Sequence, residues 1–366
     1  MTRDDLCSKR YEALEAFSHI GNIKSCVKHG NGHINDTYLV TTDDKRYILQ
    51  RINDVVFPNP VQVMENIKGI TEHIRNKSID NGINPERSTL TIVNTDVGDI
   101  YFRDSYGSYW RMYLFVERTV AKEKVNGADD FRCCAEAFGN FQSMLADYPA
   151  DTLYETIANF HNTPVRFNNL LNAINDDKAG RAASVKEEIE FSLARKDFTQ
   201  ILEKARENNE IPLRVTHNDT KLNNILFDAI NGDAVCVVDL DTVMPGYAVN
   251  DFGDAIRFGA NTAAEDETDL SKVKLDLCLF EAYAEGFLKG CKERLTANEI
   301  KLLPIGAMMM TFECGMRFLT DHLNGDVYFK IHRENHNLDR CRNQFALLAD
   351  MERKLEQMNS IVKKYY

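Results

Sequence analysis

The sequence is poor in long apolar runs, in positive charge and in cysteines spaced for a metal. No stretch approaches ~20 uninterrupted apolar residues, so we expect no membrane span. The 44 Lys and Arg are outnumbered by 56 Asp and Glu, and the net charge of -12 argues against nonspecific binding to nucleic acid or anionic membranes. The nine cysteines include no C-x-x-C pair, which favours reduced thiols. The charged N-terminus does not look like a signal peptide, so we expect a cytoplasmic protein, and we expect it to be a monomer.

One polar segment carries the layout of a kinase catalytic loop. In VTHNDTKLNNILF (residues 215–227), His217, Asp219 and Asn224 form the pattern H-x-D-x-x-x-x-N. In phosphoryl transfer the protein mainly positions groups and neutralises charge, so this spacing gives a carboxylate and an amide separate tasks. We predict that Asp219 accepts the proton of the attacking hydroxyl and that the amide oxygen of Asn224 binds magnesium. His217 is expected to shape the loop through hydrogen bonds.

The residues after this loop predict a β-hairpin that returns a second acidic group. Residues 225–227 are predicted to form one strand, residues 231–233 the turn and residues 235–238 the returning strand. The hairpin would bring Asp239 back beside Asn224, where a carboxylate and an amide oxygen suit a hard cation. The alternative is a plain hairpin with a polar entry loop, but the four elements in this order favour the catalytic interpretation.

A literal DFG triplet at residues 251–253 matches the metal-binding signature of protein kinases. We nevertheless assign the metal to Asp239, because it directly follows the strand that starts from the catalytic loop. Asp251 comes after a further loop and begins a helical segment. We expect Asp251 to hydrogen-bond the backbone of the catalytic loop or to cap that helix.

The order of predicted elements indicates a bilobal α+β protein with a protein-kinase-like fold. The first third combines strands with one amphipathic helix at residues 60–77, and helices dominate from residue 129 onward. The predicted strands cover residues 38–40, 46–51, 89–93, 99–102 and 109–116. We place a β-rich nucleotide-binding lobe at residues 1–116. The larger lobe, residues 117–366, would carry the catalytic loop, the metal site and the acceptor pocket.

Two features near the first strands bear on how a nucleotide's phosphates are bound. Gly30 and Gly32 of the GNGH turn would let backbone amides approach phosphate oxygens. In YILQRI, the position where kinases carry a phosphate-pairing lysine is occupied by Gln50 or Arg51. The absence of that lysine leaves open which residue supplies the positive charge.

Phe115, Val116 and Glu117 lie at the predicted boundary between the lobes. In this architecture a connecting segment offers backbone N–H and C=O groups to adenine, so we predict that these three residues bind the base. The alternative is an ordinary strand end. In the strand that leads to this segment, Trp110 is expected to lie in the core rather than to stack on a ligand.

Beyond the shared motif, the chain resembles the aminoglycoside phosphotransferase-like kinases, which combine a protein-kinase-like fold with small-molecule substrates. The segments that carry this resemblance are HNDTKLNN (217–224), VVDLDTVMPG (237–246) and DFGDAIRFGA (251–260). The resemblance runs almost the whole length and extends to a subgroup that acts on N-acetylated hexosamines. The segments that carry this second resemblance are GHINDTYLVTTD (32–43), RYILQRIN (46–53), FHNTPVRF (160–167) and ECGMRFLTDHLNGDVYF (313–329).

The resemblance implies a reaction and a set of site residues. The reaction is phosphorylation of the anomeric hydroxyl of GlcNAc or GalNAc, with ATP as donor and Mg2+, to give the sugar 1-phosphate by direct in-line transfer. Asn224 and Asp239 would hold the magnesium, and Gln50 in place of the lysine is compatible with the subgroup. The residues implied at the sugar are Asp219 as the base, Arg317, Tyr328 and His33.

Part of this pocket is indicated by helical spacing alone. Glu313, Arg317 and Asp321 lie at i, i+4 and i+8, so they share one face of a helix beside a long apolar run. Such a face is directed either at solvent or at a polar pocket, and the sequence leaves both open. The planar fork of an arginine suits sugar hydroxyls or phosphate oxygens. His161 is expected to be structural.

Two other functions remain open. A kinase of another small alcohol, such as homoserine or choline, is possible; a cationic acceptor would need an acidic, aromatic pocket, and Asp241, Asp254 and Tyr247 could build one. A protein of a different class, an inactive nucleotide-binding scaffold, is disfavoured by the intact catalytic-loop residues.

Overall fold

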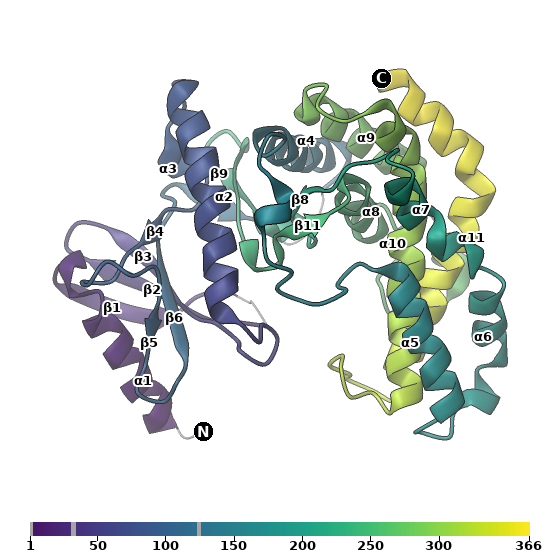
Figure 1. Ribbon diagram of the computed structural model, residues 1–366, viewed down its shortest axis with the longest axis horizontal. Coiled ribbons are helices and arrows are strands. Elements are labelled where there is room, and N and C mark those ends of the chain that lie inside the picture. Colours follow the sequence, from purple (N-terminus) through teal and green to yellow (C-terminus); the bar gives the residue numbers. More distant parts are fainter. Residues whose placement is uncertain (1–2, 31–33, 123–125) are drawn as a thin grey trace. The chain divides into compact units, whose positions relative to one another are not determined.

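The structure, a computed structural model, describes residues 3–30, 34–122 and 126–366 (Figure 1). The chain divides into two units. The first unit comprises Met1–Val120, Thr152–Ala158 and Leu226–Met244. The second comprises Ala121–Asp151, Asn159–Ile225 and Pro245–Tyr366. The predicted boundary lies at one point, after Val116, whereas the first unit continues to Val120 and takes up two later segments, one of which carries Asp239.

An antiparallel sheet forms the larger part of the first unit. Its strand order is β1-β2-β3-β6-β4, with β5 paired to β6. The strands are β1 (Ile23–Lys28), β2 (Asp36–Thr42), β3 (Arg46–Arg51), β4 (Ile92–Val93), β5 (Phe102–Arg103) and β6 (Tyr109–Leu114). β2, β3 and β6 confirm predicted strands. β4 is shorter than the strand predicted at residues 89–93, and β5 overlaps the strand predicted at residues 99–102 only at Phe102. β1 was not predicted, because most side chains of this edge strand are exposed and carry little of the alternation that marks a half-buried strand.

One face of this sheet forms the core of the first unit with α1 (Arg3–Glu15) and the turn after it. Leu49 of β3 and Trp110 of β6 are fully buried there against Phe17. Trp110 is therefore a core residue, as predicted, and its Nε1–H donates to Asp104 Oδ2 at 2.9 Å. α1 was not predicted, because a helix with few apolar residues is fixed mainly by tertiary packing.

The opposite face of the sheet carries polar side chains and packs on α2. Because side chains alternate along a strand, Gln50 and Arg111 point away from the core that contains Leu49 and Trp110. α2 (Pro60–Asp80) confirms the predicted amphipathic helix, and α3 (Pro85–Ser88) follows it. Nη1 of Arg111 lies 3.9 Å from Sδ of Met64 on α2.

The predicted hairpin after the catalytic loop is present. β9 (Ile225–Asp228) and β10 (Ala234–Val237) are neighbours in a three-stranded sheet that β7 (Thr119–Ala121) completes. Gly232 in the turn has φ +77°, a left-handed conformation that glycine adopts without strain. Asp239 follows the end of β10, as the sequence analysis expected.

Helices dominate the second unit, as predicted. They are α4 (Ala128–Met144), α5 (Thr163–Asp176), α6 (Lys186–Leu193), α7 (Ile201–Glu207), α8 (Ala248–Gly259), α9 (Leu277–Cys291), α10 (Ala297–Asn324) and α11 (His336–Val362). Two short strands, β8 (Arg214–Thr216) and β11 (Met244–Gly246), precede the catalytic loop and α8 respectively. Figure 1 shows α10 among α5, α8 and α11, the three helices with which it has extensive contacts.

α10 is the central core helix of the second unit. Thr296 and Glu299 form a capping box at its start, and Gly325 in a left-handed conformation ends it. Among the described residues, it is the one helix long and apolar enough to span a membrane, but 78% of its apolar window is buried inside the protein. Its apolar composition is therefore explained by burial among the neighbouring helices.

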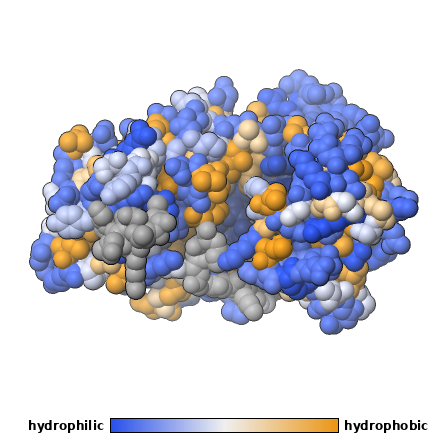
Figure 2. All heavy atoms as spheres, turned by 90° about the horizontal axis from the view of Figure 1, so that it is seen from below, coloured by the Kyte–Doolittle hydropathy of each residue, from blue (hydrophilic) through white to orange (hydrophobic). Residues whose placement is uncertain are grey.

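The surface and the cysteines are the features that the composition predicts most directly. The face in Figure 2 is mostly hydrophilic, with hydrophobic residues in small groups, in keeping with the high content of charged side chains. Eight of the nine cysteines, all except Cys7, are reduced thiols in the structure.

Two glycines allow α8 and α10 to cross closely. A Cβ added to Gly253 would lie 2.3 Å from the carbonyl oxygen of Gly306, and one added to Gly306 would lie 2.2 Å from that of Val249. Neither backbone oxygen can move without separating the helices. The crossing therefore requires residues without a side chain at both positions.

We predict that Gly253→Ala lowers the free energy of unfolding by about 2–3 kcal/mol, because the new methyl group forces the two backbones apart. Gly259→Ala in the same helix is the comparison and should lose less, since the nearest atoms to its Cβ would be ring atoms of the Phe131 side chain and not backbone atoms. Urea unfolding of both variants measures the difference. Equal losses would show that backbone proximity at Gly253 is not the limiting contact.

Candidate active site

The catalytic loop leaves β8 and is held by a carboxylate from α8. The backbone N–H groups of His217 and Asn218 donate to Oδ2 and Oδ1 of Asp251, both at 2.8 Å. The Thr220 hydroxyl donates to the carbonyl of Asp251 at 2.6 Å. Asn218 has φ +63°, an unusual conformation for a non-glycine residue, and these bonds hold it in place.

Asp251 is therefore a structural residue of the loop, as the sequence analysis expected. Its side chain is buried and also accepts a hydrogen bond from Gln142 Nε2 at 2.8 Å. Burial raises the pKa of this carboxyl, although His217 and the three donated hydrogen bonds lower it. Both oxygens are thus occupied by protein donors, which leaves little capacity for a metal. The alternative of helix capping does not apply, because Tyr247 is the N-cap of α8.

His217 is buried between aromatic rings. Its imidazole meets the rings of Phe138 and Phe141 edge to face, with centroid distances of 5.4 and 5.9 Å. The side chain is 0% exposed, so it cannot reach a substrate. His217 thus shapes the loop from its inner side, as predicted, and the catalytic role predicted for Asp219 does not involve it.

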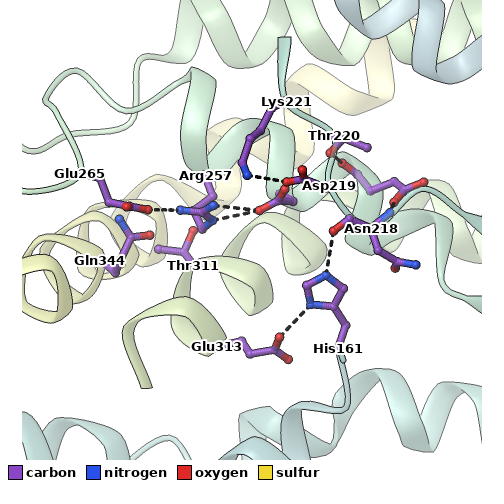
Figure 3. A network of polar contacts seen from close by, with 12 residues as sticks. His161, Asn218, Asp219, Thr220, Lys221, Arg257, Glu265, Thr311, Glu313 and Gln344 are labelled. Atoms are coloured by element: carbon purple, nitrogen blue, oxygen red, sulfur yellow. Dashed lines mark hydrogen bonds and ion pairs between the residues drawn. The ribbon is translucent and has the colours of Figure 1, made fainter. Parts of the chain in front are cut away.

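Asp219 is flanked by an amide and an ammonium group. Nδ2 of Asn224 donates to Oδ2 of Asp219 at 3.0 Å and to its carbonyl oxygen at 2.8 Å. Nζ of Lys221 lies 2.6 Å from Oδ1 of Asp219 (Figure 3). Burial alone would lower the pKa of Lys221, but the carboxylates of Asp219 and Asp254 outweigh burial and raise it. Lys221 was not among the predicted site residues, although its position two residues after Asp219 could have indicated a place in the site.

The orientation of Asn224 fits its predicted role as a magnesium ligand. Its amide nitrogen is directed at Asp219, and within the described part of the chain no donor contacts its Oδ1. An amide oxygen in that state is a suitable ligand for a hard cation that keeps several waters. Asp239, the other predicted ligand, belongs to the first unit and has φ +58° and ψ +58°. A strained backbone of this kind is typical of functional positions.

Gln50 lies in β3 of the first unit, at the place where a lysine was expected. Its Nε2 donates to the hydroxyl of Thr37 at 3.0 Å, and its Oε1 accepts a hydrogen bond from Nε of Arg111 at 3.0 Å. Arg51, the other occupant considered, is paired with Asp36 at 2.6 Å. The positive charge next to Gln50, where a lysine was expected, is therefore that of Arg111 on β6.

The glycine turn is described only in part. Gly30 has φ +72°, and an added Cβ would meet no atom of the described residues within 4 Å. Gly32 and the predicted sugar contact His33 lie outside the described residues. Their roles at the phosphates and the sugar stay predictions.

The predicted adenine-binding segment has both kinds of backbone group to offer. The Phe115 amide donates to the Arg46 carbonyl at 3.0 Å, and the Val116 carbonyl accepts from Thr119. Among the described residues, no hydrogen bond engages the Phe115 carbonyl or the Glu117 amide. This pattern is compatible with adenine recognition by residues 115–117, which stays a prediction.

Arg317 and Tyr328, both predicted at the sugar, lie together in the second unit. The guanidinium of Arg317 has three aromatic rings within 6 Å, those of Phe160 at 5.6 Å, Phe329 at 5.5 Å and Tyr328 at 5.9 Å. No carboxylate among the described residues forms an ion pair with Arg317. The Tyr328 side chain is 67% exposed, so the cluster is open on one side.

Asp321 fixes the loop that carries these rings. Its Oδ1 accepts the backbone N–H groups of Val327 and Tyr328, at 3.0 and 2.8 Å, and its Oδ2 accepts that of Phe329 at 2.9 Å. Asp321 is 4% exposed. The polar face predicted on α10 is therefore turned toward a polar site and not toward bulk solvent.

Glu313, on the same face, binds the catalytic loop through His161. Figure 3 shows His161 between Glu313 and Asn218, with its Nδ1 2.8 Å from Oε1 of Glu313 and its Nε2 3.3 Å from the Asn218 carbonyl. Burial would lower the pKa of His161, but the Glu313 carboxylate raises it overall. The same pair lowers the pKa of Glu313 against the effect of burial. His161 is structural, as expected, but it connects α10 to the loop that carries Asp219.

The remaining acidic group near the base is also paired. Asp254 Oδ1 accepts from Nε and Nη2 of Arg257, at 3.1 and 3.0 Å. Arg257 also contacts Glu265 at 2.8 Å. Burial would raise the pKa of Asp254, but Arg257 and Lys221 lower it, so this carboxylate stays charged and partnered.

With this geometry in place, comparisons with known proteins identify the family. A profile described as "Phosphotransferase enzyme family" matches residues 25–277, which is more than half of the chain. The match includes the catalytic loop, the hairpin with Asp239 and the DFG triplet.

Solved structures share the fold at low sequence identity. The microcompartment-associated aminopropanol kinase has a TM-score of 0.64 and 17% identity, over 96% of this chain and 98% of that chain. An aminoglycoside phosphotransferase from Alicyclobacillus acidocaldarius has a TM-score of 0.60 and 12% identity, over 97% and 96%. Spectinomycin phosphotransferase, in complex with ADP and spectinomycin, has a TM-score of 0.55 and 12% identity, over 96% and 98%. The predicted α+β, protein-kinase-like fold class is thereby confirmed.

We predict opposite phenotypes for the two candidate metal aspartates. Asp239→Asn should lower magnesium-dependent turnover roughly 10²–10³-fold, because a charged ligand is lost, with little effect on folding. Asp251→Asn should destabilise the protein by about 1–3 kcal/mol, because the amide nitrogen that replaces one carboxylate oxygen cannot accept the N–H group bound there. Magnesium titration of the rate and thermal unfolding distinguish the two. The reverse pattern would reassign the metal to the DFG triplet.

We predict a pH dependence of stability that originates in His161. The pKa of His161 in the folded protein is raised above the usual 6.5. The contribution of protonated His161 to the free energy of unfolding is therefore fully present below pH 6.5, and it is lost as the pH rises through the folded-state pKa. The free energy of unfolding should fall over this window in the wild type, and less in His161→Gln. Urea unfolding at a series of pH values measures it, with Glu313→Gln as the partner control. An unchanged slope in both variants would contradict the assignment.

Proposed function

The chain belongs to the phosphotransferase enzyme family, and from this premise we propose that it is an N-acetylhexosamine 1-kinase. It would transfer the terminal phosphoryl group of ATP to the anomeric hydroxyl of GlcNAc or GalNAc. The observation that carries the choice of acceptor is Arg317, a guanidinium among three aromatic rings with no carboxylate partner among the described residues.

The catalytic loop supports direct transfer to a hydroxyl. Asp219 has a carboxylate whose two oxygens are oriented by Asn224 and Lys221. A carboxylate held in this way can accept the proton of an attacking hydroxyl, while Lys221 keeps positive charge where the phosphoryl group approaches. No additional nucleophile is needed, so we infer in-line transfer without a phosphoenzyme.

The donor and the metal follow from the same residues. Asn224 and Asp239 are the residues that would hold Mg2+, through an amide oxygen and a carboxylate. When bound, the ion would neutralise charge on the phosphate oxygens. The spectinomycin phosphotransferase with the same fold was in complex with ADP, which supports a nucleotide donor.

The charges around the acceptor region favour a neutral sugar over a cationic alcohol. Two arginines, Arg166 and Arg317, lie in this region. Burial lowers the pKa of Arg166, and the positive charge of Arg317 lowers it further. The acidic groups of this region, Glu313 and Asp254, are paired with His161 and Arg257. A cationic acceptor would meet an excess of positive charge. Sugar hydroxyls and an N-acetyl carbonyl can accept hydrogen bonds from the guanidinium fork.

The main alternative is a kinase of an amino alcohol, the kind of substrate named for the aminopropanol kinase that shares the fold. Its acidic pocket would have to come from Asp241, Asp254 and Tyr247. Each of these groups is already engaged, Asp241 with Arg111, Asp254 with Arg257, and the Tyr247 hydroxyl with Glu203 at 3.0 Å. This engagement disfavours the alternative.

We predict that the protein phosphorylates GlcNAc and GalNAc in preference to glucose, galactose, homoserine, choline and aminopropanol. The assay follows ADP release with Mg2+ and ATP and locates the phosphate on O1 by NMR. Asp219→Asn should lower kcat by roughly 10²–10⁴-fold, because the general base is lost. Preference for an amine-bearing acceptor would overturn the sugar assignment, and no turnover of any acceptor would favour the inactive scaffold.

In the same assay, Arg317→Met should raise the KM for the N-acetylhexosamine about tenfold or more, by the loss of charge-assisted hydrogen bonds. Arg195→Met is the matched control, since Arg195 lies 3.5 Å over the ring of Phe191 and pairs with Glu352 away from the catalytic loop. Equal KM values for the two variants would remove Arg317 from the acceptor site.

A further inference from the structure

Gln50 stands at the place of the missing lysine because Arg111 lies beside it. The two residues are direct Cα partners across β3 and β6. Gln50 accepts the hydrogen bond of the Arg111 Nε–H through Oε1, and its own Nε2 is held by Thr37. A lysine at position 50 would remove this acceptor and place a second positive charge against the guanidinium. Glutamine at this position is therefore complementary to arginine at position 111.

Arg111 is a buried cation with one buried carboxylate partner. Its side chain is 2% exposed and that of Asp241 is 3% exposed, and Nη1 lies 2.5 Å from Oδ1. Charges removed from water to this degree are tolerated only when they are paired. Burial would lower the pKa of Arg111, but Asp241, Tyr113 and Asp239 raise it, so the guanidinium stays charged.

Asp241 belongs to the segment that carries Asp239, the proposed magnesium ligand. Asp241 lies in η6 (Leu240–Thr242), for which Asp239 is the N-cap. Oδ2 of Asp241 accepts a hydrogen bond from Nδ2 of Asn35 at 2.6 Å, and the Asp241 carbonyl accepts one from the Thr156 hydroxyl at 3.3 Å. These contacts fix the backbone that follows Asp239.

The backbone of Asp239 needs such support. Its φ of +58° and ψ of +58° lie in the left-handed region, which a non-glycine residue keeps only where the surroundings hold it. Asn66 on α2 adds a further contact to this segment, a hydrogen bond from Nδ2 to the Val243 carbonyl at 3.0 Å. The sheet and α2 of the first unit thus hold the chain just downstream of Asp239.

We propose that Arg111 is a positioning residue for phosphoryl transfer. Through Asp241, Arg111 holds Asp239 in the conformation that receives the metal–nucleotide complex. Arg111 also supplies, from β6, the positive charge that a lysine on β3 would supply in other kinases. This inference rests on the proposed function as a kinase. All of its residues belong to the first unit, so it can be tested with nucleotide and metal alone.

The test is the double variant Arg111→Gln/Asp241→Asn, which removes both charges together and leaves neither one unpaired. We expect it to fold, with the Kd for Mg·ADP raised about 10–100-fold in calorimetry, as is usual when a partner of a metal ligand is lost. Hydrogen exchange of the amides of residues 239–243 should become faster. The value of kcat should fall, while the KM for the sugar stays at the wild-type value.

The control is Arg342→Gln/Glu188→Gln, which removes an ion pair between α11 and α6 in the second unit. It should retain the wild-type Kd for Mg·ADP and the slow exchange of residues 239–243. If the Arg111/Asp241 variant behaves like this control, the pair is merely structural and the proposal is overturned. If that variant does not fold, Arg111→Lys replaces it, since lysine keeps the charge but lacks the planar fork whose Nε and Nη1 contact Gln50 and Asp241 separately. A wild-type Kd in Arg111→Lys then overturns the proposal.

These measurements are independent of the acceptor. A wild-type protein that binds Mg·ADP but phosphorylates no N-acetylhexosamine would overturn the proposed function and leave the role of Arg111 intact. A wild-type protein that does not bind Mg·ADP would overturn both.

Discussion

The buried carboxylate of Asp251 is the interaction on which the second unit depends. It accepts the backbone amides of the catalytic loop, so the direction in which Asp219 points is set from the start of α8. The same helix crosses α10 at Gly253, where a single added methyl group would collide with backbone. α10 in turn carries Glu313 and Arg317. The packing of α8 therefore relates the position of Asp219, the proposed base, to that of Arg317, the proposed acceptor contact, and a packing defect at α8 would displace one from the other.

The distribution of charge in the site is very different from that of the whole chain. The protein has an excess of 12 negative charges, yet the acidic groups beside the proposed base Asp219 are held either by basic side chains or, for Asp251, by hydrogen-bond donors. Asp254 is paired with Arg257, and Glu313 with His161. Arg317 and Arg166 retain charges without a carboxylate partner among the described residues, and Arg166 donates to the Phe160 carbonyl instead. A protein that is acidic overall can thus present a locally cationic site, because fully paired carboxylates contribute little field beyond their partners.

The sequence predicted those parts in which local pattern and tertiary structure agree. The hairpin that returns Asp239, the strands β2, β3 and β6 and the structural role of Asp251 all follow from spacing and alternation. α1 and β1 were missed, because their residues are mostly polar and become ordered by packing on the sheet. Arg111 was missed for a different reason. A β-ladder register brings it to Gln50 from 61 residues away, and a single sequence contains no signal for that pairing.

Trp110, the only tryptophan, is the direct neighbour of Arg111 in β6 and is fully buried in the first unit. Tryptophan emission therefore reports on the six-stranded sheet of the first unit alone, whereas far-ultraviolet circular dichroism is dominated by the helices of the second unit. The two spectroscopic signals follow different halves of the molecule. If they change at different denaturant concentrations, the units unfold separately, and a single free energy of unfolding would not describe the chain.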